Sequence, residues 1–158
     1  MAKWFKFSEF CVSGSHPELV EVPKEGTQIY NNIVYLMERM DIIREAWGSA
    51  IKITSGWRPT RLNTAVKGAR NSQHLSAQAC DFVPVKGNIM DLVALIVNMD
   101  MDWDQLLIEK YTAKNGVITN CSWIHLSFSR VNNRRQILAW NGKQYIPVKV
   151  TQETKFKI

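Results

Sequence analysis

The spacing of hydrophobic residues predicts two helices. Between residues 28 and 47, apolar side chains recur at steps of three and four positions, which is the spacing of one helix face. These positions hold Ile29, Ile33, Leu36, Met37, Met40, Ile43 and Trp47. Gly48 follows as a helix stop, so we expect a helix over 28–47 whose apolar stripe belongs to the core. A second helix is expected from Asn88, its N-cap, to about Met99.

Shorter stretches predict strands, because polar and apolar residues alternate in them or short apolar runs lie between turn residues. The expected strands span 51–54, 79–85, 105–109, 123–129 and 144–150. Asn115-Gly116 is a hairpin signal, which we expect to join the strand over 105–109 to the strand over 123–129.

Together these elements predict one domain over residues 1–158, of the α+β class, with helices packed on a small antiparallel sheet. Residues 1–27 are expected to be irregular, and 59–66 to form a short helix with proline in its first turn. With 46% hydrophobic and 22% charged residues, the composition is that of a globular chain. Three cysteines without a paired spacing argue against a disulfide framework.

The charge balance is basic, with a net charge of +6 and a pI near 9.3. Such a balance favours polyanionic partners, but it also describes a basic surface without a particular partner. No nucleic-acid-binding motif accompanies it, so we expect no nucleic-acid partner. The first residues lack the features of a signal peptide, and no apolar run approaches the roughly 18 residues that span a bilayer. We expect a monomer that is made in the cytoplasm, without a transmembrane segment.

Two of the three histidines form a candidate metal site with one aspartate. His74 and Asp81 lie seven positions apart, and His125 follows much later. Two neutral imidazoles and one carboxylate bind zinc firmly and leave a fourth position open for water, as in a catalytic zinc site. Strand alternation places Asp81 and His125 on polar faces of their strands.

Each of these residues also has an ordinary structural explanation. Asp81 would pair with an arginine, because an unpaired carboxylate in an apolar strand is costly to bury. His125 would donate to a backbone carbonyl. A nucleophilic pair of Cys121 and His125 is a further alternative, although no family signature surrounds the cysteine. Taken together, the three candidate ligands favour a metal.

The run from Ser72 to Asp81 resembles the S-x-H-x-x-G-x-A-x-D signature of zinc D-Ala-D-Ala carboxypeptidases, L-alanyl-D-glutamate peptidases and related bacteriophage endolysins. These proteins share a fold with the zinc-binding domain of hedgehog signalling proteins. The resemblance extends over residues 7–138, where further motifs occur in matching order. They are Ser55-Gly56-Trp57-Arg58, Leu62-Asn63, Gly68-Ala69, Asp104-Gln105-Leu106 and Trp123-Ile124-His125. A hedgehog/DD-peptidase-like fold is therefore implied.

The resemblance implies one zinc ion with His74, Asp81 and His125 as its ligands. It implies that Arg58 holds the substrate and stabilises the oxyanion. A guanidinium suits this role, because its fork matches a carboxylate or a tetrahedral oxyanion. The structural alternative is a loop arginine that ties down its neighbours.

Two positions depart from the family pattern. Ala77 stands where the signature has glycine, and alanine would be strained there if its φ were positive. Ser122 stands three residues before the last zinc histidine, where many relatives have the catalytic glutamate.

We expect Glu109 to serve as the base, because the predicted hairpin brings its strand beside that of His125. Asp104 is the fallback. The structural alternative is that Glu109 pairs with Lys110 or Arg134.

Three further residues are expected to contact the substrate. Ser72 and Gln73 would orient the zinc ligands or the substrate, since metal ligands need such supporting partners. Trp123 would line a cleft, with packing in the core as its alternative.

The expected function is zinc-dependent hydrolysis of peptidoglycan stem peptides or cross-links, by a D-Ala-D-Ala carboxypeptidase or an endopeptidase. Some relatives cut L-Ala-D-Glu bonds instead. A phage-type endolysin that reaches the wall after release, or a virion-associated enzyme, fits these expectations. The alternative is a zinc-binding protein that keeps the fold as a binding or structural module without hydrolysis.

Overall fold

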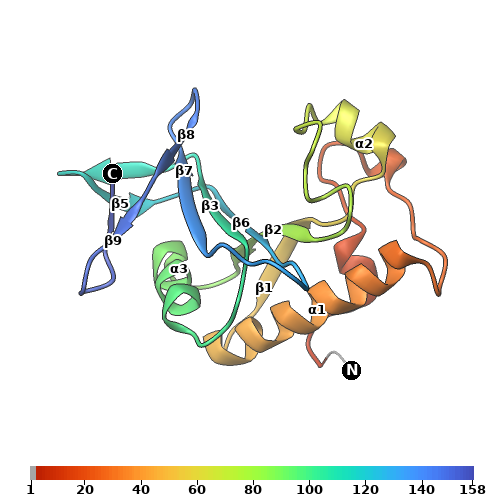
Figure 1. The fold of residues 1–158 in the computed structure, drawn as a ribbon, viewed down its shortest axis with the longest axis horizontal. Helices are drawn as coiled ribbons and strands as arrows, with labels where there is room; N and C mark the ends of the chain where they lie inside the picture. Colours follow the sequence, from red (N-terminus) through yellow and green to blue (C-terminus); the bar gives the residue numbers. More distant parts are fainter. Residues whose placement is uncertain (1–2) are drawn as a thin grey trace.

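Helices and a six-stranded sheet surround the hydrophobic core of the computed structural model, which describes residues 3–158. The two main helices are α1 (Gln28–Trp47) and α3 (Ile89–Asn98), and a short helix, α2 (Thr60–Ala65), stands apart from them (Figure 1). The N-terminal segment is irregular apart from two 3-10 helices, Phe7–Phe10 and Pro17–Leu19.

The large sheet has the strand order β1-β2-β6-β3-β7-β8. Neighbouring strands are antiparallel, except that β7 runs parallel to β3. Its strands are β1 (Ile51–Ser55), β2 (Ala79–Pro84), β3 (Gln105–Glu109), β6 (Trp123–Ser127), β7 (Gln136–Trp140) and β8 (Tyr145–Pro147).

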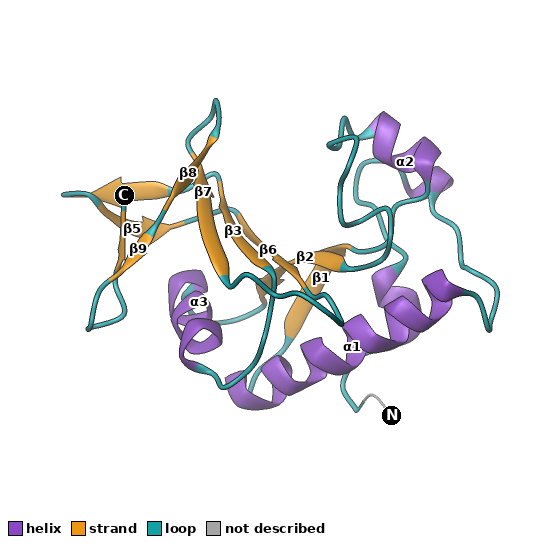
Figure 2. Ribbon diagram, viewed as in Figure 1, coloured by secondary structure: helices purple, strands orange, loops and turns teal. Residues whose placement is uncertain are grey.

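A second sheet, in the order β4-β5-β10-β9, stands at one end of the molecule beside α3 (Figure 2). Its strands are β4 (Thr112–Lys114), β5 (Val117–Asn120), β9 (Lys149–Val150) and β10 (Phe156–Lys157).

One face of the large sheet packs against the two main helices. The apolar stripe of α1 joins strand residues such as Phe82 and Ile124 in a single hydrophobic cluster. The Thr27 side chain caps the first turn of α1, and Gly48 ends the helix with a φ of 77°. The Asn88 side chain caps α3 in the same way. Caps and apolar stripe therefore act together to define where each helix begins and ends.

The α+β class is confirmed, as are most of the expected elements. The helix α1 has the expected bounds, and β1, β2, β3 and β6 begin where the sequence pattern placed them. The short helix α2 begins at Thr60 because Pro59, with a ψ of 157°, lies outside the helical region and serves as the N-cap residue.

Two expectations about the C-terminal half were wrong. Residues 144–150 do not form one strand, because the chain leaves the large sheet after Pro147 and joins the small sheet at Lys149. The Asn115-Gly116 turn has the positive φ values of a hairpin, but it joins β4 to β5 in the small sheet. The strands β3 and β6 nevertheless pair directly, as expected.

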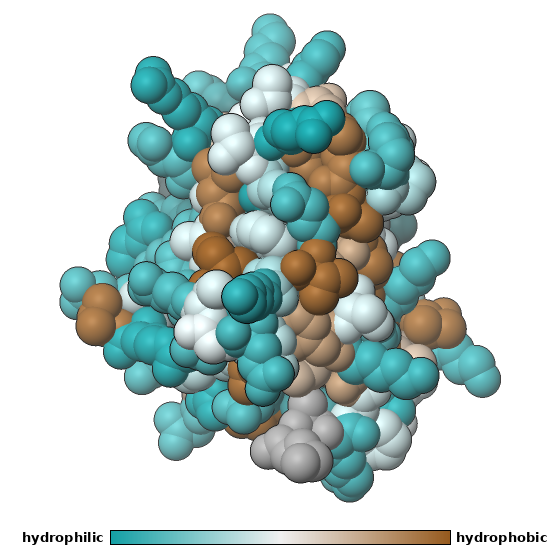
Figure 3. Space-filling model, turned by 90° about the vertical axis from the view of Figure 1, so that its right-hand side faces the viewer, coloured by the Kyte–Doolittle hydropathy of each residue, from teal (hydrophilic) through white to brown (hydrophobic). Residues whose placement is uncertain are grey.

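None of the described helices has the length and hydrophobicity needed to cross a membrane. On the side that carries α2 and the start of α1, brown hydrophobic side chains form a broken band between teal hydrophilic ones (Figure 3). Scattered exposed hydrophobic residues of this kind are normal for a folded protein.

Ile124 tests the core beneath the large sheet. It is 0% exposed on the inner strand β6. Ile124→Ala should lower the free energy of unfolding by about 2–5 kcal/mol, because burial is lost and a cavity remains. Val131→Ala, at a position that is 84% exposed, should change it by less than about 0.5 kcal/mol. Urea denaturation followed by circular dichroism measures both, and equal losses would contradict the assignment of this face to the core.

Candidate metal centre

The other face of the large sheet is the floor of an open cleft of about 830 Å³. Asp81 lies directly opposite His125 on the neighbouring strand, and His125 lies directly opposite Leu107. Directly paired residues project from the same face of a sheet, so these side chains point into the cleft while their chain neighbours enter the core. The segment between β1 and β2 lines one side of the cleft, and β7 and β8 line the other.

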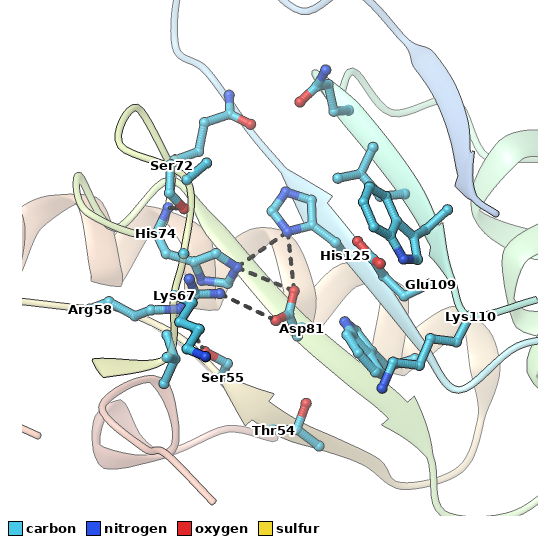
Figure 4. A pocket seen from close by; sticks show the side chains of 18 of the residues that line it. Thr54, Ser55, Arg58, Lys67, Ser72, His74, Asp81, Glu109, Lys110 and His125 are labelled. Atoms are coloured by element: carbon cyan, nitrogen blue, oxygen red, sulfur yellow. Dashed lines mark hydrogen bonds and ion pairs between the residues drawn. The ribbon is translucent and has the colours of Figure 1, made fainter. Parts of the chain in front are cut away.

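Three side chains converge on this floor (Figure 4). His74 Nε2 lies 3.2 Å from Asp81 Oδ1 and 3.2 Å from His125 Nδ1. His125 Nδ1 lies 3.1 Å from Asp81 Oδ1. All three residues are buried, and their ligand atoms lie within 4.8 Å of one another. The residues that the sequence suggested as zinc ligands thus form one candidate metal site.

The chemistry of this donor set fits a cation. His74 Nδ1 lies 2.7 Å from the carbonyl oxygen of Gly56, which can only accept a hydrogen bond. This bond assigns the proton of a neutral ring to Nδ1, so Nε2 presents its lone pair to the Asp81 carboxylate and to His125. A cation suits electron-rich atoms at this spacing, and two imidazoles with one carboxylate are the ligands of many catalytic zinc sites.

Burial and charge keep two of these candidate ligands in the forms that a metal requires. Burial raises the pKa of Asp81, but His74 and His125 more than offset this rise and hold the pKa well below its usual range. Burial lowers the pKa of His125, and its hydrogen bond to Asp81 offsets only part of that change. At neutral pH, Asp81 is therefore a carboxylate and His125 a neutral imidazole.

Arg58 is held at the edge of the ligand group. Its Nη2 lies 3.6 Å from Asp81 Oδ2. Its Nη1 donates to Asn63 Oδ1 at 3.0 Å, and its Nε donates to Ser55 Oγ at 3.3 Å. Asp81 therefore has the arginine partner that its structural alternative predicted. Arg58 also ties down its neighbours Ser55 and Asn63, as its own structural alternative predicted. These three contacts hold the guanidinium at the wall of the cleft, beside the candidate ligands.

Close packing around these loops requires two glycines. A Cβ on Gly56 would lie 2.1 Å from a backbone oxygen of the first 3-10 helix, and one on Gly68 would lie 2.1 Å from Asn63 Oδ1. The Gly56 carbonyl holds His74, and Asn63 holds Arg58. Asn63 is part of the Leu62-Asn63 motif, for which the sequence suggested no role. The structure shows that its side chain holds Arg58 at the edge of the site.

Ala77 occupies the glycine position of the signature, and its φ is 58°. This left-handed conformation explains why the signature has glycine, since a side chain there costs about 1–2 kcal/mol. The Ala77 methyl group is fully buried in the core, so its packing offsets part of this cost.

Glu109 lies on the cleft floor beside the ligand group. It pairs in register with Trp123, which stands two residues before His125, so the three side chains share one face. Within residues 3–158, neither of the basic residues considered as its partner bonds to it; instead the Tyr145 hydroxyl donates to Glu109 Oε1. Burial raises the pKa of Glu109, and the bond from Tyr145 opposes this rise.

Asp104, the fallback base, is bound elsewhere. Arg134 Nε and Nη2 donate to its two carboxylate oxygens at 2.8 and 2.9 Å, and Gln73 Nε2 donates at 2.7 Å. These contacts, the Arg134 bond first, lower the pKa of Asp104 to about 2. Asp104 is not among the described residues that line the cleft, so its contacts are structural.

The remaining candidate substrate residues all line the cleft. Ser72 Oγ accepts a hydrogen bond from the His74 backbone N–H at 3.2 Å, and Gln73 is the residue that binds Asp104. Trp123 lies under the Lys110 ammonium, 5.3 Å from the ring centre. Their contact with substrate stays a prediction.

Tyr145 is the residue of this site that the sequence did not reveal. It lies on the edge strand β8, within the stretch expected to be a strand, but no motif gave it a role in the site. Its place depends on the parallel pairing of β7 with β3, which brings β8 to the side of the strand that carries Glu109. Such a long-range pairing has no local signal.

The alternative pair of Cys121 and His125 does not form. Cys121 is buried and belongs to the hydrophobic core. Burial raises the pKa of its thiol to about 12, so the thiol stays protonated and is a poor nucleophile at neutral pH.

Comparison with known families agrees with this geometry. The family model of peptidase M15 matches residues 5–127. The chain belongs to this family. Peptidases of the M15 family are zinc-dependent, and the matched region contains His74, Asp81 and His125. A comparison with curated proteins found no match. The M15 match ends with β6, so β7, β8 and Tyr145 lie outside it.

Gly56 offers a test of how the candidate ligand group is supported. Gly56→Ala should lower the affinity for zinc about 10- to 100-fold, because the added Cβ displaces the carbonyl that orients His74. Gly14→Ala is the control, since a Cβ there meets nothing within 4 Å. Competition with a chromophoric chelator measures both affinities. Equal affinities in the two variants would show that the Gly56 carbonyl does not support the site.

Proposed function

We propose that this M15 protein is a zinc peptidase that hydrolyses the stem peptides or peptide cross-links of peptidoglycan, as a D-Ala-D-Ala carboxypeptidase or an endopeptidase. The observation that carries the proposal is the convergence of His74, Asp81 and His125 in an open cleft, with Glu109 on the same face of the sheet. A buried structural site would be closed on all sides, whereas this one borders a cleft large enough for a peptide.

His74, Asp81 and His125 would hold one zinc ion. When bound, zinc supplies Lewis acidity, which polarises a peptide carbonyl and activates water near neutral pH. The residues around the site then need to orient the peptide, accept a proton and stabilise negative charge.

Glu109 is the proposed general base. A carboxylate whose pKa is raised by burial is better matched to proton transfer near neutral pH than an exposed one. It would accept a proton from the attacking water and deliver it to the amine of the leaving residue. Tyr145 binds one of its oxygens and leaves the other available for this transfer.

Arg58 is the proposed electrostatic partner of the substrate. Its guanidinium is fixed by Asn63 and Ser55, so little freedom is lost when it binds a carboxylate or the oxyanion. Ser72, Gln73 and Trp123 line the same cleft and are proposed to contact the peptide.

The biological role that suits this chemistry is degradation of the cell wall by a phage-type endolysin, either released from the host cytoplasm or carried by the virion. A basic protein is attracted to an anionic wall, which fits this role. The alternative is a zinc-binding module without hydrolysis, which Ser122 at the usual glutamate position would favour.

Glu109→Gln separates these two functions. The variant should lower kcat for release of amino groups from purified peptidoglycan by about 100- to 10,000-fold, because the amide cannot accept the proton. Zinc content should stay at one ion per chain. Glu21→Gln, at an exposed position, should behave as the wild type. Undiminished hydrolysis in Glu109→Gln would remove Glu109 as the base, and a wild type that hydrolyses no peptidoglycan would favour the binding module.

Tyr145→Phe tests whether the Tyr145 hydroxyl positions Glu109. It should lower kcat about 10-fold while KM changes less than about twofold, because a hydrogen bond to a charged group is lost without a change in the cleft walls. Tyr35→Phe is the control, since Tyr35 lies on α1, where its ring stacks with Arg130. A kcat equal to that of the control would contradict the role of Tyr145.

A further inference from the structure

Positive charge is concentrated in one part of the chain. Residues 110–158 contain nine lysine and arginine residues and one acidic residue, Glu153. Residues 1–109 contain 11 basic and 13 acidic residues. The net charge of +6 therefore arises in the last third of the chain. An asymmetry of this kind within one chain indicates a polyanionic partner.

Strand register places three of these lysines in one row on the small sheet. Lys114 on β4 pairs with Val117 on β5, and Val117 pairs with Lys157 on β10. Lys157 in turn pairs with Lys149 on β9. Directly paired residues share a face, so the row crosses all four strands on one side of the sheet. The opposite face buries Ile118 and lies toward α3, which contacts β5.

The structure of the sheet does not by itself explain this row. All three lysines are exposed, and within the described part of the chain none of them forms a salt bridge. Lysine on the edge strands β4 and β9 discourages edge-to-edge association. That reason does not apply to Lys157, which lies on the inner strand β10 directly opposite another lysine, where like charges destabilise the sheet. A ligand that neutralises the row would account for all three.

We propose that the lysine row, Lys114, Lys149 and Lys157, binds a linear polyol-phosphate polymer of the bacterial wall. Strands spaced about 4.8 Å apart give the row a length of roughly 14 Å, which spans successive phosphates of a phosphodiester chain. The row contains no aromatic ring, the platform on which single-stranded nucleic acids stack their bases. The choice of a wall polymer rests on the proposed function, and the row would hold the enzyme near its substrate.

The test is binding of the zinc-loaded full chain to purified poly(glycerol phosphate). The triple variant Lys114→Gln/Lys149→Gln/Lys157→Gln should bind at least about 10-fold more weakly than the wild type at low salt. The slope of log affinity against log salt concentration should fall by about two, because fewer counterions are released. Hydrolysis of small soluble peptidoglycan fragments should not change, since the row lies outside the cleft.

A matched control separates the row from net charge. The variant Lys24→Gln/Lys52→Gln/Lys86→Gln loses the same charge at three exposed positions elsewhere and should bind the polymer nearly as the wild type does. Equal weakening in the two triple variants would overturn the proposal, because net charge alone would explain binding. Two further ligands are compared with the polymer: single-stranded DNA with the same number of phosphates, and phosphatidylglycerol vesicles. If the wild type binds either of them more tightly than the polymer, and only the row variant loses that binding, the assignment to a wall polymer is overturned.

The two proposals fail separately. If the wild type hydrolyses no peptidoglycan, the peptidase proposal is wrong, yet the polymer-binding difference between the triple variants still decides the role of the row. If hydrolysis is found and both triple variants bind alike, only the lysine row loses its assignment.

Discussion

The direct pairing of Asp81 with His125 is the constraint on which the site depends. Both residues alternate with core residues along their strands, so one hydrogen-bonded ladder positions the hydrophobic core and two candidate metal ligands together. A slip of β2 by one residue relative to β6 would turn Asp81 into the core and expose Phe82, while His125 kept its place. Such a slip would bury a carboxylate without a partner, which is costly, and the hydrophobic pattern therefore protects the geometry of the site.

The third candidate ligand needs separate support, because His74 comes from a loop. Its carbonyl accepts the Arg58 backbone N–H at 3.0 Å, while its ring donates to Gly56. The neighbouring Gln73 binds Asp104, which in turn binds Arg134. The ligand loop is thus tied to the start of β3 and to the segment before β7. Rigidity of this loop reduces the reorganisation that binding of a metal requires.

The sequence predicted what local patterns encode. Periodicity and caps defined α1 and α3, and alternation placed Asp81 and His125 on the cleft face of their strands. The parallel strand β7, the division of residues 144–150 between two sheets and the contact of Tyr145 with Glu109 were not predicted. They depend on pairings between distant strands, and the sequence of β7, Gln-Ile-Leu-Ala-Trp, shows no alternation that would mark it.

Strand register also bears on the proposal that Glu109, rather than an acid at position 122, is the base beside the candidate ligand His125. Position 122 lies just outside β6, and the Ser122 backbone N–H donates to the Glu109 carbonyl at 2.8 Å, so the two positions are neighbours across the ladder. A carboxylate on β3 shares the face of His125 because of its pairing with Trp123. A side chain at 122, beyond the strand and exposed, is less firmly directed toward that face. An acid at position 109, as proposed, would therefore lie beside the candidate ligands and have the fixed surroundings of an inner strand.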